Sequence, residues 1–261
     1  MIKLIASDLD ETLLPEGTFD LNPEYYDVIR QLSDRGILFA ASSGRHYSSI
    51  AKLLGPVKDD IVILAGNGSC VMWKGKPLCL REIPYETYLR ALKDMREANP
   101  DIILTDHPDC VYTDTDNEEM FRWIHDGYRV NLHRCEDLSS VGTPVLKTAM
   151  FVSSDAAEYA GKLSSSYSGE LNVMAAGTHW VDLVAKSVDK GAALGTVQER
   201  FGISMQETIA FGDNGNDIGM LKLAGHSYAV ENARDEVKEA ADEVIGPMKE
   251  DAVLNILKAL L

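Results

Sequence analysis

Positive charge is scarce in this sequence. The 261 residues include 25 lysines and arginines against 41 aspartates and glutamates, so the formal net charge is −16 at pH 7. A surface of this sign repels nucleic acids and anionic membranes, and no basic run offsets it. We therefore expect neither as a partner. An anionic small-molecule substrate would need a local group of positive side chains to overcome the field.

Cysteine pairs and long apolar runs are also missing. The four cysteines are scattered and form no C-x-x-C pair: Cys70, Cys79, Cys110 and Cys135. This spacing argues against a zinc site and is typical of reduced thiols in a cytosolic protein. The first ten residues turn acidic too early for a signal peptide, and no apolar run approaches the length that spans a membrane. We expect a cytoplasmic protein.

The glycine-rich motifs of nucleotide-binding enzymes are absent as well. A dinucleotide-binding enzyme needs G-x-G-x-x-G after its first strand, but DLDETLL at residues 8–14 contains no glycine, and the chain has no P-loop. In that place stand two aspartates, Asp8 and Asp10, followed by Thr12. Two carboxylates this close to a buried strand are costly unless something neutralises them.

Hydrophobic periodicity predicts an α/β architecture at both ends of the chain. With 45% hydrophobic residues, the chain can bury a substantial core. Strand-like and helix-like segments alternate, and this order predicts a Rossmann-like, doubly wound parallel sheet covered by helices. The predicted strands are 2–7, 37–42, 60–66, 207–212, 227–230 and 243–245, and the predicted helices are 23–36, 47–55, 189–202, 216–225, 233–241 and 251–261.

The middle of the chain breaks this rhythm. Long polar stretches such as 113–127 interrupt it, although 147–154 and 179–185 still have strand-like patterns. The simplest interpretation is a single α/β domain formed by residues 1–84 and 186–261. An α+β domain, residues 85–185, is then inserted between its halves.

Four polar clusters fall where the predicted sheet presents its carboxyl edge. They are DLDET at 8–12, SSGR at 42–45, DKG at 189–191 and GDNGND at 212–217. Each alone has an ordinary explanation as a turn, a helix cap or a solvated lysine. Ligands of open α/β sheets bind at this edge, however, so the clusters are expected to share one site.

Together the clusters describe phosphoryl transfer. Two or three carboxylates at one edge suit magnesium, which prefers a few carboxylates together with water and phosphate oxygens. A lysine and a serine hydroxyl at helix starts can hold phosphate oxygens. One aspartate can attack phosphorus, and its neighbour can protonate the leaving oxygen and then deprotonate water.

The same residues resemble the four motifs of the haloacid dehalogenase superfamily, in family order. DLDET resembles D-x-D-x-T, SSGR the Ser/Thr motif, DKG the lysine motif and GDNGND the acidic G-D-x-x-N-D motif. The size and position of the insert, and GNGS at 66–69, resemble the Cof-type sugar-phosphate phosphatases. In that group the insert is a cap domain over the active site, and we expect it to select the leaving group.

The resemblance implies catalytic and metal-binding roles for individual residues. Asp8 matches the nucleophile, Asp10 the acid/base, and Thr12 the residue that steadies the acid/base loop. Asp213 matches the metal ligand, and Asp8 and the Asp10 carbonyl complete the protein ligands of Mg²⁺. Glu11 stands where glycine is frequent in the family.

The resemblance also implies a phosphate-binding set. Its members are expected to contact phosphate oxygens or the groups that hold them: Ser43, Gly44, Arg45, Lys190 and Asn216, with Asp217 as a supporting residue. Ser42 is the weaker candidate for the hydroxyl role. Ser43 replaces the commoner threonine but keeps the hydroxyl.

These patterns predict a magnesium-dependent phosphatase for small phosphate monoesters, acting through an aspartyl-phosphate. A phosphomutase or phosphotransferase with the same aspartate nucleophile is the alternative, and the core motifs do not separate the two. A response-regulator receiver is excluded because receivers are shorter and lack both the insert and the second aspartate. Nothing in the sequence specifies which ester is the substrate or what the oligomeric state is.

Overall fold

The computed structural model describes residues 1–261 and divides into two compact units. Unit 1 consists of Met1–Cys79 and Asp189–Leu261, and unit 2 is the intervening Leu80–Val188. The predicted boundaries, after residues 84 and 185, fall a few residues from these. Each unit has its own sheet and its own hydrophobic core.

Unit 1 is built on an eight-stranded sheet of order β14-β13-β12-β1-β2-β3-β4-β5. All pairs from β14 to β3 are parallel, and β4 joins β3 antiparallel. The predicted α/β fold class is thereby confirmed. The strands are β1 (Leu4–Asp8), β2 (Leu38–Ser42), β3 (Ile61–Ala65), β4 (Cys70–Trp73), β5 (Lys76–Leu80), β12 (Thr208–Gly212), β13 (His226–Val230) and β14 (Glu243–Ile245).

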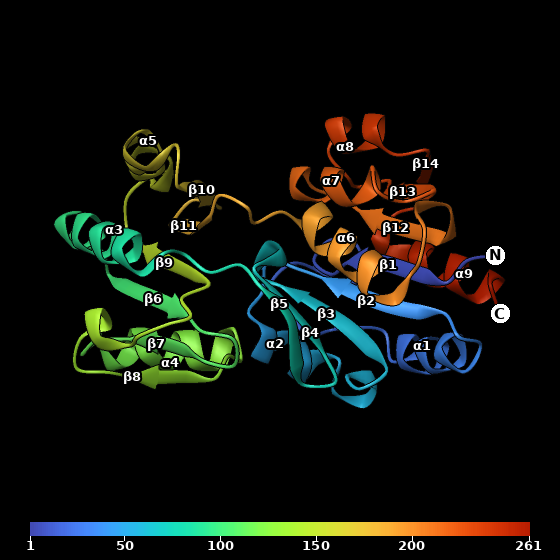
Figure 1. Cartoon of the computed structure of the whole chain (residues 1–261), viewed down its shortest axis with the longest axis horizontal. Coiled ribbons are helices and arrows are strands. Elements are labelled where there is room, and N and C mark those ends of the chain that lie inside the picture. The colour runs from blue at the N-terminus through green and yellow to red at the C-terminus, as the bar shows by residue number, and fades with distance from the viewer. The chain divides into compact units, whose positions relative to one another are not determined.

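Helices of unit 1 cover both faces of this sheet. In Figure 1, α1 and α2 lie on one side, and α6, α7 and α8 lie on the other. Helix α1 shows why: its Tyr25, Val28, Ile29 and Leu32 recur at helical spacing and are buried, which gives the helix one apolar face. The helices are α1 (Glu24–Asp34), α2 (Tyr47–Leu53), α6 (Lys190–Phe201), α7 (Ile218–Leu221), α8 (Asp235–Ala240) and α9 (Ala252–Ala259).

The strand order places a topological switch point at β1. The chain proceeds from β1 to β2 and β3 on one side, and from β12 to β13 and β14 on the other. Connections leaving β1 and β12 therefore diverge at their carboxyl ends, which is where ligands of doubly wound sheets bind. Asp8 is the last residue of β1, and Asp213 directly follows β12.

Two features of unit 1 differ from the prediction. The expected helix at 216–225 is only the four-residue α7, preceded by a 3-10 turn at Gly215–Asp217. The β4–β5 hairpin was not predicted. Its turn places Lys74 and Gly75 at φ 49° and 70°, and two consecutive residues with positive φ are typical of a tight hairpin turn.

Unit 2 has a six-stranded sheet of order β10-β11-β9-β6-β7-β8. Its strands are β6 (Ile102–Asp106), β7 (Val111–Thr113), β8 (Leu132–Arg134), β9 (Lys147–Phe151), β10 (Leu171–Ala176) and β11 (Trp180–Ala185). Its helices are α3 (Tyr85–Glu97), α4 (Glu118–Gly127) and α5 (Ala156–Tyr167). Helix α4 lies within the polar stretch 113–127 and was not predicted, although Asn117 caps its start by accepting the backbone N–H groups of Glu119 and Met120; Ile124 is its only buried residue.

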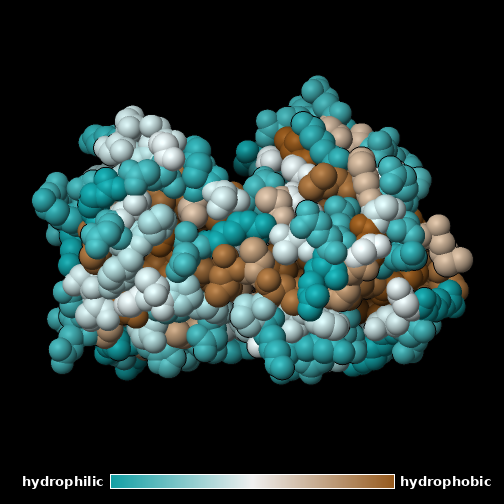
Figure 2. All heavy atoms as spheres, viewed as in Figure 1, coloured by the Kyte–Doolittle hydropathy of each residue, from teal (hydrophilic) through white to brown (hydrophobic).

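Neighbouring residues of β6 belong to different cores, as the alternation of a strand requires. Ile103 packs into a cluster with Tyr88 of α3 and Leu163 of α5, whereas Ile102 packs with Ile124 of α4. Hydrophilic residues cover much of the face seen in Figure 2. No helix of the structure has both the length and the apolar character needed to cross a membrane.

The close packing of α6 on α7 generates a prediction. A Cβ at Gly191 would lie 2.6 Å from the backbone of Gly219, whereas a Cβ at Gly195 in the same helix would meet nothing nearer than 4.0 Å. We expect Gly191→Ala to destabilise the protein by ~1–3 kcal/mol through overpacking. Gly195→Ala should be neutral or stabilise it by up to ~1 kcal/mol, because alanine favours helix. Urea unfolding midpoints measure both, and equal effects would contradict the packing argument.

Candidate active site

The predicted site residues all belong to unit 1, in two segments far apart in the chain. Asp8 ends β1, Ser42 ends β2, Lys190 begins α6, and Asp213 follows β12. The segments meet because β1 pairs with both β2 and β12 in parallel, so their carboxyl ends lie at one edge. The expected shared edge is present.

A buried ion cluster joins the two segments. The Nζ of Lys190 donates to Oδ1 of Asp8 and, at 2.7 Å, to Oδ1 of Asp217. Lys190, Asp8 and Asp217 are 1%, 5% and 0% exposed. Asp189 caps α6 by accepting the backbone N–H of Ala192 at 2.9 Å, which sets Lys190 in the first helical turn.

Asp217 also organises the loop after β12. Its Oδ2 accepts the backbone N–H groups of Asp213 and Asn214, each at 3.0 Å. Both carboxylate oxygens are therefore engaged, one by the loop and one by Lys190. The contacts assign Asp217 the task of holding the Asp213 loop and the Lys190 ammonium in place.

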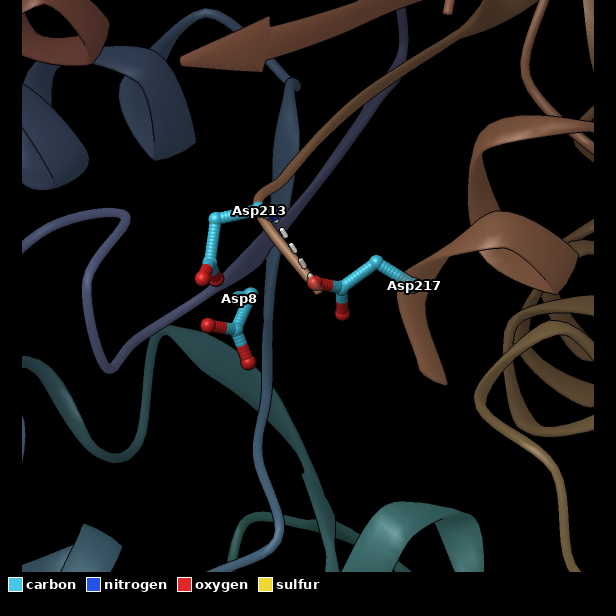
Figure 3. A group of neighbouring side chains, drawn as sticks. All are labelled: Asp8, Asp213 and Asp217. Atoms are coloured by element: carbon cyan, nitrogen blue, oxygen red, sulfur yellow. Dashed lines mark hydrogen bonds between the residues drawn. The ribbon is translucent and has the colours of Figure 1, made fainter. Parts of the chain in front are cut away.

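Three carboxylates converge at this edge. Ligand oxygens of Asp8, Asp213 and Asp217 lie within 4.8 Å of one another. Figure 3 shows the carboxylate of Asp213 directed toward Asp8, with Asp217 to one side. Because Asp217 is already committed to hydrogen bonds, Asp8 and Asp213 are the side chains best placed to hold a metal.

Burial and mutual repulsion raise the pKa values of these acids. Burial raises the pKa of Asp8 well above its ordinary range, and Asp217 and Asp213 add to the rise against the opposing effect of Lys190. Burial, reinforced by Asp217, raises the pKa of Asp213 to about 6. Burial lowers the pKa of Lys190, but the carboxylates of Asp217 and Asp8 outweigh it, so this pKa lies above its usual value.

Two residues of the DLDET loop have structural features that the motif did not indicate. The hydroxyl of Thr12, 1% exposed, donates to Oδ1 of Asp213 at 3.1 Å, so it ties the loop after β1 to the loop after β12. Glu11 has φ 58°, in the left-handed region that favours glycine. A positive φ at this position accords with the glycine that is frequent there in the family.

Arg45 lies against Asp10 in the structure. Its Nε donates to Oδ2 of Asp10 at 2.9 Å and its Nη2 to Oδ1 at 2.5 Å, and Nη2 also reaches the carbonyl of Thr18 at 2.8 Å. A two-bond pairing of this kind orients a carboxylate strongly. Arg45 therefore contacts the predicted acid/base, a contact that the phosphate-binding assignment did not include.

The remaining predicted phosphate ligands lie in short loops. The Oγ of Ser43 accepts the backbone N–H of Arg45 at 3.1 Å, which leaves the hydroxyl proton available to a ligand. Asn216 is exposed, and its Nδ2 donates to Oδ1 of Asn67 at 2.9 Å. Asn67 belongs to the GNGS segment and has no predicted role at the site.

Comparison with known proteins identifies the family. The profile of the haloacid dehalogenase-like hydrolases matches residues 5–257, nearly the whole chain. The chain belongs to this family. The resemblance drawn from the four motifs is thereby confirmed, including its assignment as an enzyme of the phosphatase type.

Relatives of this haloacid dehalogenase-like hydrolase match over full length. The 5-amino-6-(5-phospho-D-ribitylamino)uracil phosphatase YbjI of Escherichia coli is 26% identical, with 100% of this chain and 96% of that protein covered. The HMP-PP phosphatase of Yersinia pseudotuberculosis is 26% identical over 98% of this chain and 94% of its own. A crystal structure from Eubacterium rectale is 33% identical, covers 100% and 99% of the two chains, and has a TM-score of 0.92.

The ion cluster of this hydrolase generates a stability prediction. Lys190→Met leaves the buried Asp8 and Asp217 without their cation, which should cost ~3–5 kcal/mol of unfolding free energy at pH 7.5. The loss should be smaller at pH 5, because carboxylates without a counterion can be neutralised by protons. Lys258→Met is the control: it breaks an exposed 2.8 Å pair with Glu24 and should cost no more than ~1 kcal/mol. Equal losses in the two variants would refute a structural role of the cluster.

Proposed function

We propose that this hydrolase is a magnesium-dependent phosphatase for small phosphate monoesters and that Asp8 forms an aspartyl-phosphate. The observation that carries the proposal is the position of Asp8. Its carboxylate is buried at the end of β1, at the switch point of the sheet, and is bonded by Lys190. A carboxylate at this point is a nucleophile in the place where ligands of such sheets bind.

The reaction proceeds in two half-reactions. In the first, a carboxylate oxygen of Asp8 attacks phosphorus, the ester P–O bond breaks, and Asp10 gives its proton to the leaving alcohol. In the second, Asp10 takes a proton from water, the resulting hydroxide attacks the phosphorus of the aspartyl-phosphate, and inorganic phosphate leaves. The Asp8 carboxylate and the protonated Asp10 are then restored.

In this scheme Arg45 acts on the acid/base residue, Asp10. Its two bonds to Asp10 hold the ionised carboxylate, which is the form that accepts the proton of water. The first half-reaction needs the protonated form, so the Arg45–Asp10 pair must loosen when an ester binds. Lys190 and the Ser43 hydroxyl donate hydrogen bonds to the phosphate oxygens.

The charges of the site fit a divalent cation. Asp8, Asp213 and Asp217 face the single ammonium of Lys190, so the ionised cluster holds two negative charges in excess. The donors are hard carboxylate oxygens without histidine or cysteine, which suits Mg²⁺ better than zinc. Asp8 and Asp213 would hold the ion, together with the Asp10 carbonyl. When bound, it would reduce the repulsion between Asp8 and an incoming phosphate.

The substrate class is assigned from the named relatives. The relatives described above are a phosphatase of a phosphorylated ribitylaminouracil and an HMP-PP phosphatase. Both names describe small, polar, phosphorylated metabolites. We infer that the substrate of this chain belongs to the same broad class, with water rather than a second hydroxyl as the acceptor of the phosphoryl group.

The decisive experiment replaces Asp8. Asp8→Asn keeps the shape of the side chain and removes the nucleophile, so hydrolysis of phosphorylated metabolites and of p-nitrophenyl phosphate should fall by ~10³-fold or more. Acid quenching of the wild type during turnover should yield a protein heavier by one phosphoryl group, and Asp8→Asn should not. Turnover of the variant at the wild-type rate would exclude Asp8, and transfer to a second sugar hydroxyl would identify a mutase.

Magnesium binding has a thermodynamic signature that depends on pH. The pKa of Asp213 is raised to about 6 from an unfolded value near 4, so its protonated form stabilises the fold. This contribution is present at pH 4 and is lost as the pH rises through about 6. Mg²⁺ competes with these protons, so at ~100 times its Kd it should stabilise the protein by ~2.7 kcal/mol at pH 7.5 and by much less at pH 5.

Thermal unfolding with and without MgCl₂ measures this effect. Asp213→Asn is the matched control, because it removes a proposed ligand and one buried negative charge with little change of shape. It should lose most of the response to Mg²⁺ at pH 7.5. An equal response at both pH values, or an unchanged response in Asp213→Asn, would be incompatible with the proposed site.

A further inference from the structure

The turn after β3 has no role in the scheme above, yet it adjoins every proposed phosphate-binding element. It is the short 3-10 turn Gly66–Gly68, whose central residue, Asn67, has φ 57°. Asparagine tolerates this left-handed conformation better than most residues, but the conformation is costly for it compared with glycine. A non-glycine residue here calls for a reason that lies in its side chain.

The backbone of the turn is bonded to the loop after β2. The N–H of Asn67 donates to the carbonyl of Ser43 at 2.9 Å, and the N–H of Gly66 donates to the carbonyl of Arg45 at 2.9 Å. These bonds fix the Ser43–Arg45 loop from the side of β3. They depend only on the main chain, so they would persist without the Asn67 side chain.

The side chain of Asn67 connects this loop to the one after β12. Its Oδ1 accepts the Nδ2 of Asn216 at 2.9 Å. The amide also lies against the Cα of Gly44, since a Cβ at Gly44 would be 3.2 Å from Oδ1 and 3.4 Å from Nδ2 of Asn67. One amide therefore contacts two of the proposed phosphate ligands.

The turn also abuts the helix that carries Lys190. A Cβ at Gly68 would lie 2.6 Å from the carbonyl oxygen of Asp189 and 2.9 Å from the Cβ of Ala193. Only glycine permits this approach. The loop after β2, the loop after β12 and the start of α6 thus meet at a single turn.

We propose that Asn67 is a positioning residue for phosphate binding: its amide holds Asn216 against the Gly44 loop so that the phosphate ligands are in place before an ester arrives. The inference rests on the proposed phosphatase function. Groups that are already positioned lose less conformational freedom on binding, and affinity rises accordingly. Removal of the amide should therefore weaken phosphate binding without opening the fold.

Asn67→Gly tests this directly, because glycine adopts φ 57° without strain and retains both backbone hydrogen bonds. Loss of one hydrogen bond corresponds to ~5–10-fold in affinity. The KM for p-nitrophenyl phosphate and the inhibition constant of inorganic phosphate should both rise by this factor, with kcat within ~3-fold of wild type, as expected for loss of uniform binding. The urea unfolding midpoint should not fall.

Asn99→Gly is the matched control. Asn99 also has a positive φ, 50°, is exposed, and belongs to unit 2, whereas the site residues belong to unit 1, so the same substitution occurs in the same conformation outside the unit that carries the site. Its kinetic constants should equal those of the wild type. A purely conformational effect of replacing asparagine by glycine would appear in both variants.

A double-mutant cycle distinguishes positioning from a general structural role. If Asn67 acts through Asn216, Asn67→Gly should have little further effect on phosphate inhibition in an Asn216→Ala background. Additive losses, or unchanged phosphate inhibition in Asn67→Gly, would overturn the inference while the phosphatase function stands. A wild type that neither hydrolyses phosphate esters nor binds phosphate would instead overturn the proposed function itself.

Discussion

The ammonium of Lys190, buried between Asp8 and Asp217, is the interaction on which the site depends. A buried charge is tolerated only when it is paired and hydrogen-bonded, so the three groups require one another. Through them, the end of β1 is joined to the start of α6 and to the loop after β12. The same pairing leaves an excess of buried negative charge, which favours binding of a divalent cation.

The position of Lys190 in the chain adds a topological constraint. The chain leaves unit 1 after Cys79 and returns at Asp189, so Lys190 is the second residue after the return. Unit 2 can differ in its own sheet and cores, provided that the chain re-enters unit 1 with Asp189 in the position that caps α6. Because α6 begins at this point, the helix start and its lysine are brought to the edge of β1 together.

Hydrogen bonds between loops give the site its rigidity. Thr12 holds Asp213, Arg45 holds Asp10, and Asn67 holds Asn216. Each pair joins two loops that follow different strands of the sheet. Polar bonds of this kind restrict the motion of the loops that they join.

The sequence by itself determined the fold class and the chemical types at the site. Alternating apolar segments and four motifs in order were sufficient, because buried parallel strands and phosphate chemistry both impose local patterns. The motifs placed Asp8, Lys190 and Asp213 at strand or helix ends. Only the tertiary structure decided which side chains pair: that Arg45 meets Asp10, that Thr12 meets Asp213, and that Asn67 meets Asn216. Partners as far apart as residues 67 and 216 leave no periodic signal, since their contact arises from strand order and loop conformation rather than from spacing along the chain.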